Sequence, residues 1–597
     1  MWIFLGFTLT LGFAYTIYFS FNHGMSHSAR GQQTRRMLFA TIAAWLPMVV
    51  GWTLMPFVVG GAWMLTYPLL YHLTNRKVSP DYENYADTTF GIYLIGWLTT
   101  LTLLATLWPP LLALVGVVEF VLLLPVVFMW GYYIIYGVCV DSRGLLLVQE
   151  TDLNEVFEFV RSFKWWSVLT AVMTVAMVLV GCIAGNTAIN VKFAEEFPLM
   201  GLSRVVELIL LFCYAMAVGW YLFGGRQGFV LRTGLLGLVR DVEEYMAEGK
   251  RYLSGRKRRI GSLQVIQRGV PYDKPHTILL VIGESASRDY MSAFSNYPHD
   301  TTPWMRIMTE DKAHTHIFKH AYSCTMHTVQ VLEKALTEMN QYGAKGFEES
   351  CSIIDISQAL NYKVSWFSNQ GHLGVFDTRV TILAGTCDQA KWTMQTPGVV
   401  QYDSSLLSFL NEIDGGCNNL VILHLLGSHF NFLNRYPNET HTVWGAPGVQ
   451  DDVLNYENSL RFTDEVLQKA FEFCRDRLNL KAMVYCSDHA TMPDRRRTPN
   501  FNGFRNMRIP LFVWTDDEFL LKHAERAAAM KHNAEQYFTN DLLYELMLGI
   551  FDVECNYFDE GSSLAYDHFR YKREDLLTFD GQRRVADDDE LFVTPNY

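Results

Sequence analysis

Long apolar runs fill the first 225 residues and constrain what this part of the chain can fold into. A run of about 20 apolar residues spans the hydrocarbon core of a bilayer as a helix. Residues 1–225 are therefore expected to form a helical membrane domain of roughly five to seven spans. The first run is followed by further spans and lacks a basic leader, so we interpret it as a span and not as a removable signal peptide. The runs cover residues 2–19, 37–71, 92–107, 111–139, 166–183 and 206–223.

Charge leaves the orientation of these spans open. Arg30, Arg35 and Arg36 follow the first run and favour the cytoplasm for that loop. The segment after the last run is also basic. Within residues 228–252, apolar residues recur at helical spacing with charges between them, which is typical of an amphipathic helix on anionic headgroups. A solvated linker helix is the alternative. We expect residues 226–270 to form this interfacial helix and a linker.

From residue 271 onward, strand-like and helical patterns alternate. Strand and helix in alternation predict a mostly parallel sheet with helices on both faces, an α/β fold. We therefore expect a catalytic domain over residues 271–597. The strand-like runs are residues 278–282, 364–367, 420–425, 482–485 and 509–514, and the helical patterns are residues 329–339 and 456–478.

Three of the strand-like runs end in side chains that can bind a metal. Glu284 follows the first, His429 follows the second, and Asp488 and His489 follow the third. In open α/β sheets, ligands bind beyond the carboxyl ends of the strands, so we expect these side chains at one edge. Carboxylates and imidazoles suit Zn²⁺, and Mn²⁺ is the alternative ion. A lone Asp-His pair after a strand is more often a cap or turn than a metal site.

A nucleophile for this site is expected in the segment SCTMHT, at Thr328. The residue lies just before a helical pattern, where free N–H groups favour a phosphate. Coordination to a metal would turn its weak alcohol into an alkoxide-like nucleophile. A simple N-cap role for Thr328 is the alternative.

Seven short segments follow one another between about residues 270 and 550: VIGESASRD, YPHDTTPWM, SCTMHTVQVLEKALT, WFSNQ, HLLGSHFNFLNRYP, YENSLRFTDEVL and CSDH. In amino-acid sequence and order they resemble the motifs of the membrane-bound bacterial phosphoethanolamine transferases, within the alkaline-phosphatase/sulfatase-like superfamily. The hydrophobic N-terminal part occupies the place of that family's membrane anchor. The sequence of the third segment is most similar to that of the branch that modifies the lipopolysaccharide core.

The resemblance implies that Glu284, Thr328, Asp488 and His489 surround a catalytic zinc ion. Thr328 would attack the phosphorus of phosphatidylethanolamine, release diacylglycerol and hold phosphoethanolamine covalently. A hydroxyl of an envelope glycolipid or glycan, in the lipopolysaccharide core or lipid A, would then displace it. The enzyme would lie in the bacterial inner membrane among membrane lipids, with its catalytic domain in the periplasm and no nucleic-acid partner.

Further residues follow from the same resemblance. His429 falls where the family has a substrate-side histidine that transfers a proton or binds a second zinc ion. Asn369 and His372 fall near positions that contact the phosphoethanolamine group. The chain departs from the family after Ser487-Asp488-His489, where Ala490-Thr491 replaces Gly-Glu. The next histidine after His489 is His523, so a substrate histidine expected between them is missing or is supplied from elsewhere.

Other features have simpler interpretations. His314, His316 and His320 suggest a metal cluster, but their alternation favours a half-exposed strand. Cys324 lacks the Pro or Ser and the Arg that follow a sulfatase cysteine. The soluble half has seven cysteines, which allow disulfides with at least one free thiol. Residues 495–497 could bind phosphate or form a solvated loop, and residues 587–590 are interpreted as a solvated acidic end.

Two alternative functions remain open. A membrane-anchored phosphodiesterase or glycerophosphate transferase of the same superfamily would share the metal ligands. A non-enzymatic envelope scaffold stabilised by metal would share the fold.

Overall fold

The computed structural model describes two compact units. One comprises residues 1–149 and 159–244, and the other comprises residues 150–158 and 245–597. Several predicted features lie outside the described residues: the apolar run 2–19, His372 and the three arginines at 495–497. The structure does not describe residues 1–38, 49, 52, 74–85, 109, 137–139, 141–164, 189–203, 226–227, 371–378, 394–399, 495–502 and 592–597.

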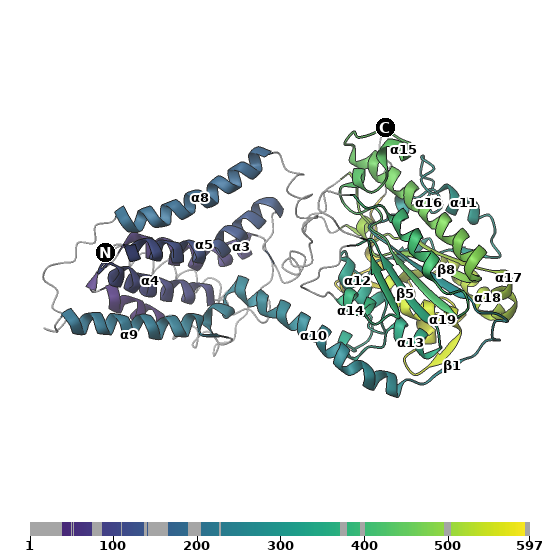
Figure 1. The fold of residues 1–597 in the computed structure, drawn as a ribbon, viewed down its shortest axis with the longest axis horizontal. Helices are drawn as coiled ribbons and strands as arrows, with labels where there is room; N and C mark the ends of the chain where they lie inside the picture. Colours follow the sequence, from purple (N-terminus) through teal and green to yellow (C-terminus); the bar gives the residue numbers. More distant parts are fainter. Residues whose placement is uncertain are drawn as a thin grey trace. The chain divides into compact units, whose positions relative to one another are not determined.

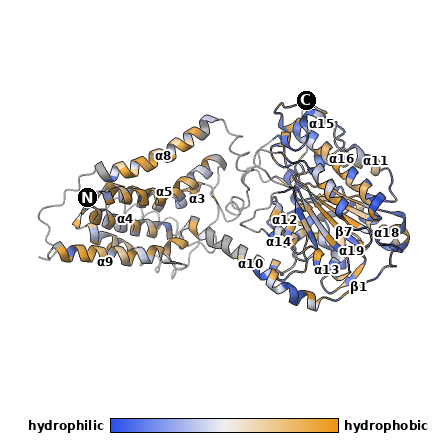
Figure 2. Cartoon of the chain, viewed as in Figure 1, coloured by the Kyte–Doolittle hydropathy of each residue, from blue (hydrophilic) through white to orange (hydrophobic). Residues whose placement is uncertain are grey.

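The first unit contains long apolar helices, shown mostly in orange in Figure 2. Within the described residues, four helical segments are long and apolar enough to cross a membrane: Ala86–Ala105, Pro110–Ile134, Leu169–Asn186 and Val205–Phe223. Shorter apolar helices cover Phe39–Met48 and Leu54–Leu70. The prediction of a helical membrane domain is confirmed, and the number of spans stays a prediction. The named helices are α3 (Leu54–Leu73), α4 (Ala86–Ala105), α5 (Pro110–Tyr136), α8 (Trp165–Ala188) and α9 (Arg204–Phe223).

The second unit is built on a seven-stranded sheet with strand order β3-β9-β8-β2-β7-β5-β6. The five strands from β8 to β6 are parallel, whereas β9 pairs antiparallel with both β8 and β3. The predicted mostly parallel sheet is therefore confirmed, with an antiparallel edge. The strands are β2 (Thr277–Gly283), β3 (Thr315–Ile317), β5 (Lys363–Ser368), β6 (Gln389–Trp392), β7 (Asn419–His424), β8 (Leu480–Ser487) and β9 (Leu511–Thr515).

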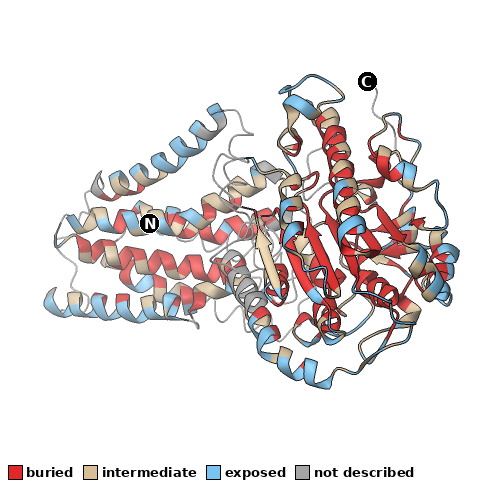
Figure 3. Ribbon diagram, turned by 45° about the vertical axis from the view of Figure 1, so that its right-hand side comes forward, coloured by how far each residue is buried: buried red, intermediate tan, exposed pale blue. Residues whose placement is uncertain are grey.

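The continuous apolar character of the central strands has a direct structural cause. Leu280 and Ile282 of β2 belong to one hydrophobic cluster, whereas Leu279 and Val281 belong to another on the opposite face. Every residue of β2 is buried, which Figure 3 shows as red strands. A strand covered on both faces needs apolar side chains at successive positions, so it does not alternate in polarity.

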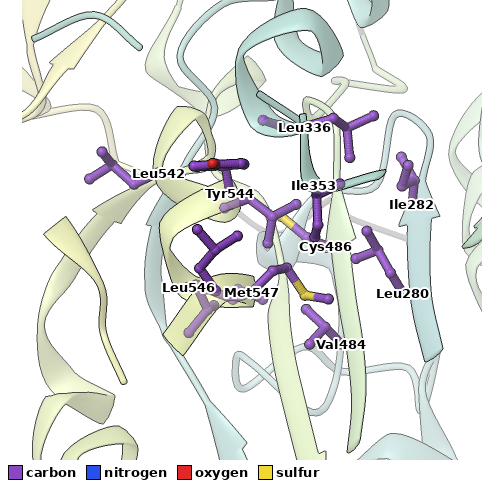
Figure 4. Close-up of a cluster of buried hydrophobic side chains, with 14 of the residues drawn as sticks. Leu280, Ile282, Leu336, Ile353, Val484, Cys486, Leu542, Tyr544, Leu546 and Met547 are labelled. Carbon is purple, nitrogen blue, oxygen red and sulfur yellow. The ribbon is translucent and has the colours of Figure 1, made fainter. Parts of the chain in front are cut away.

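Helices from distant parts of the chain cover the two faces (Figure 1). Side chains of α12 (Thr328–Ala335), α13 (Ile353–Ala359) and α19 (Leu543–Phe551) fill the first cluster, part of which Figure 4 shows around Leu280 and Ile282. Side chains of α16 (Asp452–Leu478) and α11 (Pro303–Met308) fill the second. The helix predicted at residues 456–478 is confirmed and starts earlier, at Asp452. The helix predicted at residues 329–339 is confirmed only as far as Ala335, where α12 ends.

The basic segment after the last apolar run forms the helix α10 (Gly234–Ser262). Within its later part, Tyr252 is fully buried in the first cluster and stacks on Phe347 at 4.6 Å between ring centroids. Arg256 donates to the buried carboxylate of Asp355 at 2.6 Å. This later part of the helix belongs to the second unit and packs there through Tyr252 and Arg256. Contact of α10 with a membrane surface stays a prediction.

The histidine-rich segment forms two short strands in different sheets, which are more buried than the predicted half-exposed strand. His316 lies in β3 and His320 begins β4 (His320–Tyr322), while the His314 ring lies 2.7 Å from Asp311 and 3.0 Å from Asp517. The interpretation of residues 587–590 as a solvated end is wrong for Asp588. This side chain accepts two hydrogen bonds from Arg508 and one from the Tyr322 hydroxyl.

The described cysteines of the second unit are free thiols: Cys324, Cys351, Cys387, Cys417, Cys474, Cys486 and Cys555. Among these described residues, none of the disulfides that this number of cysteines would allow is formed. Cys486 lies inside β8 and is buried, as expected for a small apolar side chain.

Candidate active site

The structure brings together the four residues expected around the metal. The Thr328 hydroxyl lies 2.9 Å from the Glu284 carboxylate, 2.7 Å from the Asp488 carboxylate and 3.5 Å from His489 Nε2. His489 Nε2 in turn lies 3.2 Å from Asp488 Oδ2 and 3.5 Å from Glu284 Oε1. The ligand atoms of the two carboxylates and the imidazole all lie within 4.8 Å of one another.

Strand pairing explains why these residues meet. Gly283 at the end of β2 pairs with Ser487 at the end of β8, so the next residues, Glu284 and Asp488, leave the sheet side by side. Gly427 closes over them with φ +50°, and a Cβ atom there would lie 2.7 Å from the Glu284 carbonyl oxygen. Glycine fits this approach because a Cβ atom would clash with the Glu284 backbone, and the left-handed φ also disfavours a side chain.

Backbone amides fix the orientation of Asp488. Its Oδ1 accepts hydrogen bonds from the Ser285 N–H at 2.9 Å and from its neighbour His489 N–H at 2.6 Å. Ser285 reaches this position with φ 59°. The other oxygen, Oδ2, is left facing Thr328. The Ser285 hydroxyl donates to Glu284 Oε1 at 2.5 Å, which orients the second carboxylate in the same way.

Two buried carboxylates next to a single hydroxyl group form a site that favours a cation. Thr328 has one hydroxyl proton, which cannot be donated to both carboxylates at once. Burial raises the pKa of Asp488, and the charge of Glu284 raises it further. Burial acts in the same direction on the pKa of Glu284 but is outweighed by the positive charges of His489 and His429, which lower it. Two buried carboxylates, an imidazole and a hydroxyl form a donor set that Zn²⁺ accepts.

Thr328 is the first residue of α12, and His327 occupies the N-cap position. A capping side chain accepts a hydrogen bond from a backbone N–H, whereas the Thr328 hydroxyl donates to carboxylates. The interpretation of Thr328 as a simple N-cap is therefore wrong. The first N–H groups of a helix have no partner within it, so α12 presents donors for an anion beside this hydroxyl.

His429 lies on the turn that follows β7, and its residue is only partly buried. Asp403 holds this turn, because its carboxylate accepts hydrogen bonds from the Leu426 and Gly427 N–H groups at 2.8 Å each. Asn369 donates to the same carboxylate at 2.8 Å and is itself buried. Through Asp403, Asn369 therefore supports the turn that carries His429, and its contact with the phosphoethanolamine group stays a prediction.

Gln370, the residue after Asn369, contacts the candidate metal ligand Glu284. Gln370 Nε2 donates to Glu284 Oε2 at 3.0 Å and to the Leu425 carbonyl at 2.9 Å. Gln370 is not among the site residues predicted from the sequence. Its position directly after a strand end, within WFSNQ, was the available signal.

Cys324 lies four residues before Thr328 but cannot act as a sulfatase-type nucleophile. The thiol is fully buried, and burial raises its pKa well above the ordinary value. Its backbone N–H donates to the Asn540 side chain at 2.9 Å. The expectation that Cys324 is not a catalytic cysteine agrees with this environment.

This chain is similar to a known family of protein domains and to curated proteins. The sulfatase family model matches residues 276–548. The phosphoethanolamine transferase EptC of Escherichia coli strain K12 is 27% identical over 271 residues, which cover 42% of this chain and 47% of that protein. The match therefore spans about half the length of that relative. The phosphoethanolamine transferase CptA of Salmonella typhimurium is 22% identical over 510 residues, which cover 75% of this chain and 83% of that protein.

One solved structure extends the similarity to both units. The integral membrane protein lipooligosaccharide phosphoethanolamine transferase A (EptA) of Neisseria meningitidis aligns with a TM-score of 0.54 and 16% identity. The alignment covers 87% of this chain and 97% of that one, so the two share an overall fold. This chain therefore has a sulfatase-like domain and is similar to membrane-bound phosphoethanolamine transferases.

Proposed function

We propose that this protein transfers phosphoethanolamine from phosphatidylethanolamine to a hydroxyl of an envelope glycolipid or glycan, in the lipopolysaccharide core or lipid A. The observation that carries the proposal is the Thr328 hydroxyl, which lies 2.7 to 3.5 Å from three metal-capable side chains at the start of a helix. The names of EptC and CptA support the transferred group. A location in the bacterial inner membrane, with the catalytic domain in the periplasm, fits the apolar helices and a lipid donor.

Glu284, Asp488, His489 and Thr328 would hold the metal, for which Zn²⁺ is the ion we propose and Mn²⁺ the alternative. When bound, the ion lowers the pKa of a coordinated hydroxyl and offsets negative charge on phosphoryl oxygens. The fit rests on the donor set and on the two buried carboxylates, which are only 1% exposed each and compete for one hydroxyl proton. We also propose that His429 can bind a second zinc ion. The number of zinc ions per protein, measured by elemental analysis, tests this.

In the first half-reaction, the Thr328 oxygen forms a bond to phosphorus and the bond from phosphorus to the glycerol oxygen breaks. The carboxylate pair accepts the Thr328 proton, and His429 supplies the proton that the leaving diacylglycerol takes up. The free N–H groups of α12 bind the phosphoryl oxygens. In the second half-reaction, the acceptor oxygen replaces the Thr328 oxygen on phosphorus. His429 then takes the acceptor proton, and the carboxylate pair returns its proton to Thr328.

Purified full-length protein with fluorescent phosphatidylethanolamine tests this proposal. We expect release of diacylglycerol and a mass increase of one phosphoethanolamine group on Thr328, lost in Thr328→Ala and retained in Thr328→Ser. Diacylglycerol release without a modified Thr328 would indicate a phosphodiesterase. Modification from a phosphatidylglycerol donor would indicate a glycerophosphate transferase. A Thr328→Ala protein with full biological effect would indicate a non-enzymatic scaffold.

A further inference from the structure

A strained turn near the C-terminus lies against residues 323–327, the loop that leads to the proposed nucleophile Thr328 and is called the nucleophile loop. Residues 579–582 join β12 (Leu577–Thr578) to β13 (Arg583–Arg584). Phe579, Asp580 and Gly581 have φ values of 53°, 54° and 77°. This left-handed region is sterically disfavoured for any residue with a Cβ atom, and only Gly581 adopts it freely. Two turn residues therefore keep a conformation that glycine would adopt more easily.

Asp580 contacts the nucleophile region at three points. Its backbone N–H donates to the Cys324 carbonyl at 3.0 Å, and its Oδ2 accepts a hydrogen bond from the Thr325 hydroxyl at 3.0 Å. Its Oδ1 lies 3.5 Å from Nζ of Lys334, a largely buried residue of α12. The Asp580 carboxylate thus links Thr325, three residues before Thr328, to Lys334, six residues after it.

The surroundings hold this turn in its strained conformation. Phe579 is 7% exposed and packs edge-to-face on Phe504 at 5.3 Å between ring centroids. The Thr578 hydroxyl donates to the Ser323 carbonyl at 2.7 Å, at the start of the same loop. Strained backbone persists only where neighbouring contacts over-determine it, and it is concentrated at functional sites. The turn also lies outside the residues 276–548 that match the sulfatase family.

We propose that Asp580 is a positioning residue for Thr328, with the turn at residues 579–582 acting as a clamp on the nucleophile loop. This inference rests on the proposed function of Thr328. Asp580 does not touch the reacting atoms. Its carboxylate fixes the two segments between which Thr328 lies, so the hydroxyl keeps its place against Glu284 and Asp488. A misplacement of about 1 Å can cost roughly 100-fold in rate, so even a small loosening of the clamp is measurable.

Asp552 offers a matched control within the same unit. It is also an aspartate with left-handed φ, 52°, and its carboxylate also binds basic side chains, with His523 Nδ1 at 2.9 Å and Arg526 Nε at 3.2 Å. The His523 ring packs on Tyr272, which packs on His276 just before β2 begins. Asp552 therefore lies at the opposite end of β2 from Glu284.

The test compares Asp580→Asn and Asp580→Gly with Asp552→Asn and Asp552→Gly in the full-length protein. Glycine relieves the backbone strain and removes the carboxylate, while asparagine keeps an acceptor for Thr325 but loses the charge facing Lys334. We expect kcat with fluorescent phosphatidylethanolamine to fall roughly 10- to 100-fold in Asp580→Gly and less in Asp580→Asn, with KM changed by less than about twofold. Both Asp552 variants should keep kcat within about twofold of the wild type.

Amide hydrogen exchange provides a readout that does not depend on turnover. We expect faster exchange across residues 323–330 in the Asp580 variants and unchanged exchange there in the Asp552 variants. Wild-type kcat in Asp580→Gly, an effect confined to KM, or equal losses in the Asp552 variants would overturn the proposal. If the wild type itself shows no transfer, the proposed function fails, and hydrogen exchange alone then decides whether Asp580 holds the loop.

Discussion

The side-chain amide of Asn540 donates a hydrogen bond to the backbone carbonyl of Asp488 at 2.5 Å. Its oxygen accepts the N–H of Cys324 at 2.9 Å. One buried side chain therefore ties the candidate metal ligand to the loop that carries the nucleophile.

Replacing Asn540 by Ala should lower turnover roughly 10-fold or more, because the loop and the strand end lose their common tie. Asn533→Ala is the matched control. The Asn533 amide is equally buried and donates to two carbonyls, those of Leu564 and Tyr566. Both variants should lose similar thermal stability, while kcat falls only in Asn540→Ala. Equal turnover in the two variants would contradict the role assigned to Asn540.

The meeting of Glu284 and Asp488 could be predicted from the sequence because its signals are local. Glu284 and Asp488 each end an apolar run, and parallel strands deliver their ends to one edge. Asn540 and Asp580 carry no such signal. They lie 52 and 92 residues beyond Asp488 in the sequence, and their partners are set by how distant segments pack. The acidic end was misinterpreted for the same reason, because the Arg508 partner of Asp588 appears only in the fold.

Removing one carboxylate should separate metal binding from stability. In Asp488→Asn we expect bound zinc, measured by elemental analysis, to be lost together with turnover, because the metal loses a charged ligand. The metal-free protein should nevertheless unfold at the same or a higher temperature than metal-free wild type, since the amide removes the repulsion between two buried carboxylates. A variant that keeps stoichiometric zinc, or whose metal-free form is clearly destabilised, would disprove this account of the site.

Gln370 should tune the metal site without being a ligand. Gln370→Ala removes the hydrogen bond that orients Glu284, and such outer contacts typically change metal affinity by about 10- to 100-fold. Zinc affinity measured by competition with a chelator checks this expectation. Gln389→Ala is the control, because Gln389 also donates to a glutamate, Glu412, but on the protein surface. Equal zinc affinity in the two variants would show that Gln370 does not support the site.

Buried neutral histidines should make the catalytic domain sensitive to acid. Burial, aided by the charge of Lys531, lowers the pKa of His316 from 6.5 to about 4. The unfolded chain therefore takes up a proton between pH 6.5 and 4 that the folded chain does not. Above pH 6.5, His316 does not lower the free energy of unfolding. As the pH falls from 6.5 toward 4, protonation of the unfolded chain lowers this free energy by up to about 3 kcal/mol.

His316→Phe removes this pH dependence, and it also removes a buried Nε2 that has no hydrogen-bond partner. In denaturant unfolding of the full-length protein, the loss of unfolding free energy between pH 7 and pH 5 should be smaller in His316→Phe than in wild type. His568→Phe is the control, because the His568 side chain is 57% exposed. If the two variants show the same pH dependence, then His316 is not a source of the acid sensitivity.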